Sequence, residues 1–255
     1  MRHIEPDARV TIDDITNAYA VIGVMGPNSR ALLQPLTEGD LSNAAFPFGT
    51  SREINIGHAT VRATRISYMG ELGWELYVPT EFALGVFDTI FAAGGPLGLK
   101  LCGMHAMDVC RIEKAYRHWG HDITDEDTPL EAGLGFAVAF DKNADFVGRE
   151  ALLRQRGQKK LSKRLLQFAI EDPEPLLYHN EPIYRDGKLV GNTSSANYGH
   201  HLGRAIAMGY VRDEGGVDAD YVAAGKWEIE VGLKRYPAGA SLRPLYDPTS
   251  ARMKA

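Results

Sequence analysis

Hydrophobic residues in the first third of the chain follow the spacing expected of β-strands. Residues 18–26, AYAVIGVMG, form a continuous apolar run that predicts a buried strand, and Pro27 follows where a helix can begin. Residues 51–57 and 58–68 are rich in β-forming side chains, and WELYVP at 74–79 continues the pattern. These runs predict an antiparallel meander.

The hydrophobic period changes after the meander. Apolar residues recur at helical spacing over 80–93, and the sequence Gly-Gly-Pro at 94–96 predicts the end of an amphipathic helix. A second helix is expected over 104–116. The segment TPLEAGLGFAVAF at 128–140 is predicted to form a turn that leads into a buried strand.

A basic run separates the two halves of the chain. Seven Lys or Arg residues stand against one acid over 149–164, which favours a solvated helix end and linker over an anion-binding patch. Short β-rich runs follow, with Asp186-Gly187 as a hairpin turn, and predict a small barrel or sandwich. We therefore predict an α+β fold, with antiparallel sheets and flanking helices in residues 1–150 and a C-terminal β-barrel domain in 160–255.

Composition narrows the class of protein and its surroundings. The chain is 44% hydrophobic and 24% charged, with a net charge of −5, which is typical of a soluble globular protein and argues against nucleic acid as a partner. No apolar run approaches the roughly 20 residues of a membrane span, and Met1-Arg2-His3 does not open a signal peptide. Two cysteines suit a reducing compartment, so the expected location is the cytoplasm or, in a eukaryote, the mitochondrial matrix.

The stretch SYMGELGWEL at 67–76 carries the most suggestive chemistry. Strand alternation places Glu75 on one face with Tyr77, and Tyr68 stands across the glycine-containing turn. A carboxylate can accept two parallel hydrogen bonds from the N–H pair of a flat heterocycle, and a neighbouring aromatic ring can stack on that heterocycle. The spacing alone equally suits a surface glutamate beside a hairpin turn.

Charged residues in 103–122 have two interpretations. Asp108 with Arg111, and Glu113 with Arg117, have the spacing of ordinary ion pairs on a helix surface, although an arginine could also hold a ligand carboxylate. Histidines in this region lack the spacing of a metal site, and no metal is predicted. Nucleotide-binding loops and nucleophile motifs are also absent from the sequence.

Three stretches together resemble the tetrahydrofolate-binding aminomethyltransferase family. They are SYMGELGWELYVP, CRIEKAYRHWGHDITDEDTPLEAGLGFAV and GKLVGNTSSANYGHHLGRAIAMGYV. The family includes the glycine cleavage T-protein and, more similar to this chain, the C-terminal regions of sarcosine and dimethylglycine dehydrogenases and oxidases. The resemblance covers nearly the whole chain.

The resemblance implies a folate site and one-carbon chemistry. It implies that Glu75 binds the pterin ring, that Tyr68 and Tyr116 line the same pocket, and that Tyr77 lies beside it. An N-methyl amine or aminomethyl carrier would donate a one-carbon unit, and 5,10-methylenetetrahydrofolate would form. Where the T-proteins have Ala-Arg-Asp this chain has Met107 at the centre, so the arginine contact would be lost or pass to Arg111.

The resemblance also sets limits on what the chain is expected to do alone. No aspartate matches the family's catalytic one, so the catalytic residues stay unassigned and the module is expected to be incomplete alone. FAD is expected only in an upstream domain or a partner, and exposed sheet edges would favour a partner chain or self-association. The alternatives are a non-catalytic folate-binding or subunit-assembly module and a folate-dependent demethylase that acts on another methyl donor.

Overall fold

The computed structural model describes Ile4 and residues 7–255, so Met1-Arg2-His3, on which the signal-peptide argument rests, lies outside the described residues. The chain divides into two compact units. The first comprises Met1–Ser67, Glu71–Leu101 and Arg252–Ala255, and the second comprises Tyr68–Gly70 and Cys102–Ala251. Each unit has its own hydrophobic core.

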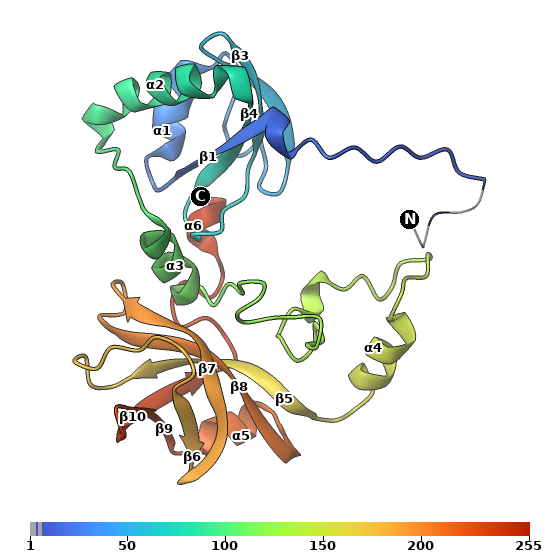
Figure 1. Ribbon diagram of the computed structural model, residues 1–255, viewed down its shortest axis with the longest axis vertical. Helices are drawn as coiled ribbons and strands as arrows, with labels where there is room; N and C mark the ends of the chain where they lie inside the picture. The colour runs from blue at the N-terminus through green and yellow to red at the C-terminus, as the bar shows by residue number, and fades with distance from the viewer. Residues whose placement is uncertain (1–3, 5–6) are drawn as a thin grey trace. The chain divides into compact units, whose positions relative to one another are not determined.

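The first unit is built on a four-stranded antiparallel sheet in the order β1-β4-β3-β2 (Figure 1). Its strands are β1 Tyr19–Met25, β2 Ser51–Ile56, β3 Ala59–Thr64 and β4 Gly73–Pro79. The helices α1 Ser29–Leu33 and α2 Ala83–Gly94 pack with the sheet. The three strands β2, β3 and β4 run consecutively in sequence, which confirms the predicted meander.

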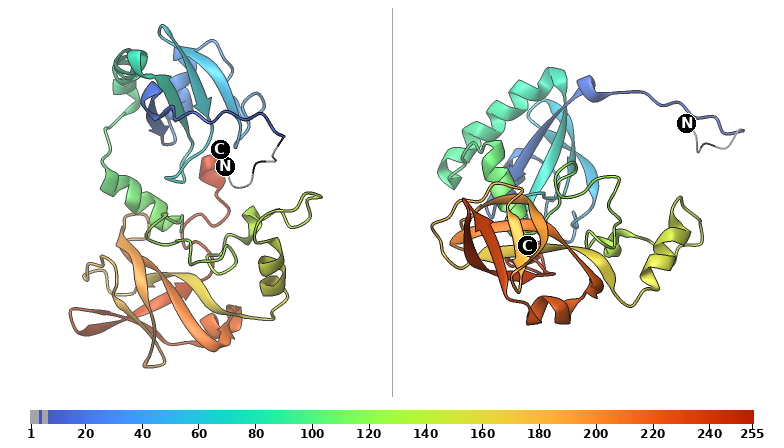
Figure 2. Two further views of the ribbon diagram at one scale, coloured as in Figure 1. Left: turned by 45° about the vertical axis from the view of Figure 1, so that its right-hand side comes forward. Right: turned by 60° about the horizontal axis from the view of Figure 1, so that its bottom comes forward.

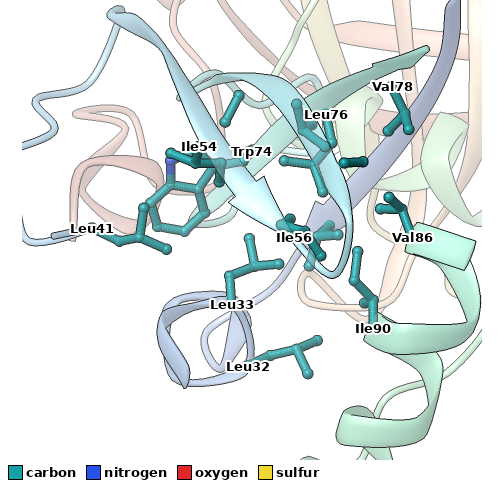
Figure 3. Packing of buried hydrophobic residues seen from close by; sticks show 14 of the residues in the cluster. Leu32, Leu33, Leu41, Ile54, Ile56, Trp74, Leu76, Val78, Val86 and Ile90 are labelled. Carbon is teal, nitrogen blue, oxygen red and sulfur yellow. The ribbon is translucent and has the colours of Figure 1, made fainter. Parts of the chain in front are cut away.

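Strand alternation on β4 builds the core of this unit. Trp74, Leu76 and Val78 are fully buried, and Figure 3 shows them pointing toward side chains of α1 and α2. Val86 and Ile90 on α2 close the same core. The residues that alternate with these core residues along each strand therefore point to the opposite face of the sheet.

Strand β1 differs from the prediction of a buried strand. Val21 is 56% exposed and Tyr19 is 41% exposed, because β1 is an edge strand that pairs with β4 and buries one face. The predicted helix over 80–93 is found, but it begins as a 3₁₀ turn at Thr80–Phe82 before α2. An apolar run cannot distinguish a strand buried on both faces from such an edge strand.

The second unit is dominated by a closed antiparallel barrel of six strands in the order β10-β5-β8-β7-β6-β9 (Figure 2). The strands are β5 Leu161–Ile170, β6 Pro182–Arg185, β7 Lys188–Gly199, β8 Arg204–Val217, β9 Trp227–Val231 and β10 Lys234–Ser241. Its helices are α3 Met104–Glu113, α4 Arg149–Arg156 and α5 Ala219–Ala224. The short helix α6 Ala251–Lys254, at the end of the chain, belongs to the first unit from Arg252 onward.

The barrel confirms the predicted C-terminal β fold. Asp186 and Gly187 have φ angles of 51° and 79° and join β6 to β7, as expected of a two-residue hairpin. Phe168, Ile183 and Trp227 lie in its core. Closure leaves the barrel without an unpaired edge strand.

The predicted strand within 128–140 is wrong. The segment forms turns and a 3₁₀ turn at Gly135–Ala137, and Phe136 is 87% exposed. Gly133 has a φ of +70°, which an extended strand does not adopt.

Among residues 7–255, no helix is both long enough and apolar enough to cross a bilayer.

Candidate functional site

Glu75 and Tyr77 lie together on the face of the first unit's sheet opposite the core. Both side chains are half-buried, whereas Trp74 and Leu76 between and beside them are fully buried. The Tyr77 hydroxyl donates a hydrogen bond to Glu75 Oε2 at 3.0 Å. The alternation predicted from the sequence is thus confirmed, and a tyrosine holds the carboxylate in place.

The surroundings of Glu75 leave its carboxylate accessible to a ligand. Gly23 on β1 is its partner on one side and contributes no side chain, and Thr64 on β3 is its partner on the other. Among the described residues, only Tyr77 donates to this carboxylate and no cation pairs with it. A half-buried carboxylate with one donor retains acceptor capacity for a ligand's N–H groups.

The hydrogen bond between Tyr77 and Glu75 predicts a measurable titration. It stabilises the neutral phenol and, with burial, raises the pKa of Tyr77 above its ordinary value. In Glu75→Gln the negative charge is lost, so the pKa of Tyr77 is expected to fall toward that value. NMR of ring-labelled tyrosine, with the signal assigned from Tyr77→Phe, measures both values. Equal pKa values in the two proteins would contradict the pairing.

Tyr68 and Tyr116 form an aromatic pair in the second unit. Their ring centroids lie 6.3 Å apart with planes inclined by 26°, and burial raises the pKa of both phenols. The Tyr68 hydroxyl donates to the carbonyl of Arg117 at 3.0 Å. Tyr116 is placed by the end of α3, where Ala115 has a φ of 53° and the Tyr116 N–H bonds the Arg111 carbonyl at 2.8 Å.

Tyr68 and Arg111 also line one hollow of about 490 Å³ within the second unit. Its walls come from α3, from the turn at 118–121, from the loop at 176–179 and from β7 at 194–198. Apolar and aromatic side chains predominate, together with four histidines: His105, His118, His121 and His179. Among the described residues, no cluster of His, Cys, Asp or Glu has the arrangement of a metal site.

Arg111 is 2% exposed, and its guanidinium makes four hydrogen bonds and ion pairs with two aspartates. Nε donates to Asp108 Oδ1 at 2.7 Å and Nη2 lies 2.6 Å from the same oxygen, so the predicted i,i+3 ion pair is found, although its arginine is buried and not on the helix surface. The other hydrogen bonds reach the Tyr116 carbonyl at 3.1 Å, the Ser195 hydroxyl at 2.8 Å and the fully buried carboxylate of Asp122. Arg111 therefore fixes this wall of the hollow, and its predicted contact with folate stays a prediction.

A β-bulge on β7 completes this polar network. The pairing register with β8 shifts between Thr193 and Ser195, which leaves Ser194 as an extra residue. Ser194 donates to Asp122 while Ser195 accepts from Arg111. In a regular strand two consecutive side chains point to opposite faces, so the bulge allows both serines to reach the buried ion pair.

The five predicted residues thus fall into two groups. Glu75 and Tyr77 belong to the first unit, and Tyr68, Arg111 and Tyr116 to the second. The sequence interpretation missed the supporting residues, which are Asp122, Ser194 and Ser195 together with the four histidines of the hollow. A buried arginine requires a carboxylate partner. Which carboxylate supplies it depends on the barrel fold, so the sequence alone does not identify Asp122.

Comparison with known families covers nearly all of the chain. Residues 1–142 match the family described as the GCVT N-terminal domain, and residues 163–247 match the glycine cleavage T-protein C-terminal barrel domain. The second match falls on the barrel strands described above.

Individual relatives are considerably longer than this chain. It is 39% identical to 4-methylaminobutanoate oxidase (formaldehyde-forming) of Paenarthrobacter nicotinovorans, over 100% of the chain and 30% of that protein. It is 40% identical to human mitochondrial sarcosine dehydrogenase, over 94% of the chain and 26% of that protein. It is also 33% identical to the mouse pyruvate dehydrogenase phosphatase regulatory subunit, over 96% of the chain and 29% of that protein. The chain therefore spans less than a third of each.

A solved structure supports the fold. The glycine cleavage system aminomethyltransferase T of Bartonella henselae superposes with a TM-score of 0.74, covering 90% of this chain and 60% of that one at 24% sequence identity. The family matches and the relatives agree with the resemblance drawn from the three sequence motifs. The chain belongs to the glycine cleavage T-protein family and is similar to the C-terminal regions of sarcosine and dimethylglycine dehydrogenases.

Proposed function

We propose that the chain is a tetrahydrofolate-binding one-carbon transferase module. The observation that carries this proposal is the carboxylate of Glu75, which is half-buried, oriented by the Tyr77 hydroxyl and unpaired with any cation among the described residues. The aminopyrimidinone edge of a pterin presents two parallel N–H groups, which match the two oxygens of a carboxylate. In this proposal Glu75 is the pterin anchor.

The remaining predicted residues have supporting roles in the proposal. Tyr77 orients the carboxylate, and the aromatic rings of Tyr68 and Tyr116 provide flat apolar surface for a ligand ring. Arg111 maintains the shape of the second unit's hollow through its four hydrogen bonds, and its contact with folate stays a prediction. The catalytic acid or base stays unassigned.

The names of the relatives indicate the class of one-carbon donor. Sarcosine and 4-methylaminobutanoate are both N-methyl amines, and formaldehyde is the product named for the second enzyme. We propose that this module receives a formaldehyde equivalent released from an N-methyl amine and forms 5,10-methylenetetrahydrofolate. The oxidation itself would take place in a flavin domain, either elsewhere in a longer chain or in a partner.

Tetrahydrofolate titration tests the binding part of the proposal. We expect saturable binding to the wild-type chain, measured by isothermal titration calorimetry under anaerobic conditions. We also expect 5,10-methylenetetrahydrofolate to form from formaldehyde and tetrahydrofolate faster than in protein-free buffer, because bound reactants are oriented. Failure to bind would contradict the folate site, whereas binding without rate enhancement would favour the second function below.

The second candidate function is a binding or assembly module without turnover. The observation that favours it is the similarity to a protein named as a regulatory subunit, over 96% of this chain. Within the part of the chain that the structure describes, β1 pairs with β4 on one side only, so its other side would offer backbone groups to another chain. Tetrahydrofolate bound with an unchanged formaldehyde reaction rate would support this function.

A further inference from the structure

A second hollow of about 370 Å³ lies in the second unit between the C-terminal end of α4 and the start of β5. Its volume would accommodate a small ligand group. Basic and amide side chains contribute much of its lining, namely Gln155, Arg156, Gln158, Lys159, Lys160 and Arg164. None of these residues belongs to the candidate site described above.

Arg164 has no carboxylate partner for its charge among the described residues. It is half-buried on β5, its Nε is shielded from solvent and makes no hydrogen bond, and no carboxylate among the described residues forms an ion pair with it. Burial accordingly lowers the pKa of its guanidinium. The adjacent Lys163 shows the usual arrangement, because it is paired with Asp127. An N–H donor that is shielded from water without an acceptor is costly, and an anionic ligand would supply the acceptor that Arg164 Nε lacks.

The side chains that line the hollow carry a net positive charge. One acid, Asp218, is in the lining, and Lys160 already pairs with it at 2.8 Å. The guanidinium of Arg156 lies 4.7 Å from the ring centre of Phe140 and has no acidic partner within the described part of the chain. Lys159 adds a further positive charge. These charges would attract an anion into the hollow.

A neighbouring arginine, Arg117, adds to the positive charge near Arg164. The charge of Arg164 lowers the pKa of Arg117, although burial is the larger cause. Arg117 itself is satisfied by the carbonyls of Ala132 at 2.9 Å and Ala115 at 2.7 Å. Two guanidinium groups are thus close enough to interact, and only Arg117 has acceptors. A ligand with several oxygen acceptors would supply the hydrogen-bond acceptors that the Arg164 guanidinium lacks.

The amide groups indicate which anion fits. Gln155 lines the hollow, and its Oε1 is buried without a hydrogen-bond donor. A phosphate group offers several acceptor oxygens to a guanidinium and an ammonium and, as a monoanion, also a hydroxyl donor for such an oxygen. A carboxylate offers only acceptors when ionised. We propose that this hollow is a binding site for the phosphate group of a small ligand, with Arg164 as its main charged contact.

This proposal revises the interpretation of the basic run at 149–164. Arg154, on the exposed face of α4, behaves as a solvated charge, with 73% of its side chain exposed and a 3.8 Å pair to Glu150. The solvated interpretation therefore suits part of the run. Arg164 departs from it, because it is half-buried on a strand and unpaired among the residues that the structure describes.

Titration of the whole chain with inorganic phosphate tests the site, in a buffer of low ionic strength because salt screens such contacts. Arg164→Gln removes the charge and is expected to weaken phosphate binding by about tenfold or more. Arg164→Lys keeps the charge and is expected to retain intermediate affinity. Lys188→Ala removes an exposed charge from the start of β7 and is expected to bind as the wild type does.

Two further measurements make the outcome independent of folding and of the folate proposal. Thermal unfolding without phosphate should show Arg164→Gln at least as stable as the wild type, because the substitution removes a half-buried charge that forms no ion pair with the described residues. Phosphate should raise the unfolding temperature of the wild type more than that of Arg164→Gln. Absence of saturable phosphate binding, equal binding by Arg164→Gln, or tighter binding of acetate than of phosphate would overturn the proposal.

Discussion

Arg111→Met is expected to lower the free energy of unfolding of the second unit by about 3–5 kcal/mol, because it removes one partner of a buried ion pair. Asp122 is fully buried, and its carboxylate would lose the guanidinium that compensates its charge. The Ser195 hydroxyl and the Tyr116 carbonyl would each lose a donor as well. Methionine fills a similar apolar volume but supplies no N–H group.

Urea unfolding of the whole chain, followed by a probe in the barrel such as Trp227 fluorescence, measures this loss. Arg154→Met is the matched control, since Arg154 is an exposed arginine with a 3.8 Å surface pair, and it should change stability by at most about 1 kcal/mol. A loss below about 1 kcal/mol for Arg111→Met would contradict the assignment of Arg111 as the central charge of a buried network.

The parts of the fold that depend on local pattern were predictable from the sequence. Alternation along 74–79 placed Trp74 in the core and Glu75 on the other face, because a strand's side chains alternate regardless of what the strand pairs with. Asp186-Gly187 identified a hairpin because few residues tolerate the required backbone angles. The β-rich second half likewise indicated a barrel or sandwich, and the barrel is observed.

Features that depend on distant residues were not predictable in the same way. Glu113 and Arg117 have the spacing of a helix-surface pair, yet Glu113 is buried and binds His201, at 2.7 Å to its backbone N–H and 2.6 Å to its ring. Arg117 instead donates to backbone carbonyls. The partner of Glu113 comes from tertiary packing, since His201 is 88 residues away in the sequence. Spacing within a helix says nothing about such contacts.

In the candidate site, too, the residues of a local strand pattern were predictable from the sequence, and the residues that meet through tertiary packing were not. The sequence motif identified Glu75 and Tyr77, and the structure shows the bond between them. Asp122 was not assigned to the site from the sequence, whereas its carboxylate binds Arg111 and Ser194. The bulge that brings Ser194 into this network is a property of the pairing between β7 and β8. No local sequence signal specifies that register.

Glu75→Gln is expected to weaken tetrahydrofolate binding by roughly 10- to 100-fold, because it replaces charge-assisted hydrogen bonds with neutral ones and removes an acceptor oxygen. The side chain keeps its size, so Trp74 and Leu76 behind it should pack as before. The stability of the first unit is therefore expected to be nearly unchanged. A loss of affinity with retained stability would identify Glu75 as a ligand contact.

Glu53→Gln provides the matched control on the same sheet. Glu53 lies on β2, is exposed, and pairs in register with Arg62 on β3, so it offers an equivalent carboxylate two strands away from Glu75. Its substitution removes the same charge without touching β4. Long-range electrostatic effects of losing one negative charge would appear equally in both variants.

The most direct test of the folate site is calorimetric titration of tetrahydrofolate into the wild type, Glu75→Gln and Glu53→Gln under identical conditions. The proposal predicts saturable binding to the wild type and to Glu53→Gln with similar affinity, and binding to Glu75→Gln that is at least about tenfold weaker. Equal affinity of Glu75→Gln and the wild type, or no saturable binding to the wild type, would contradict it.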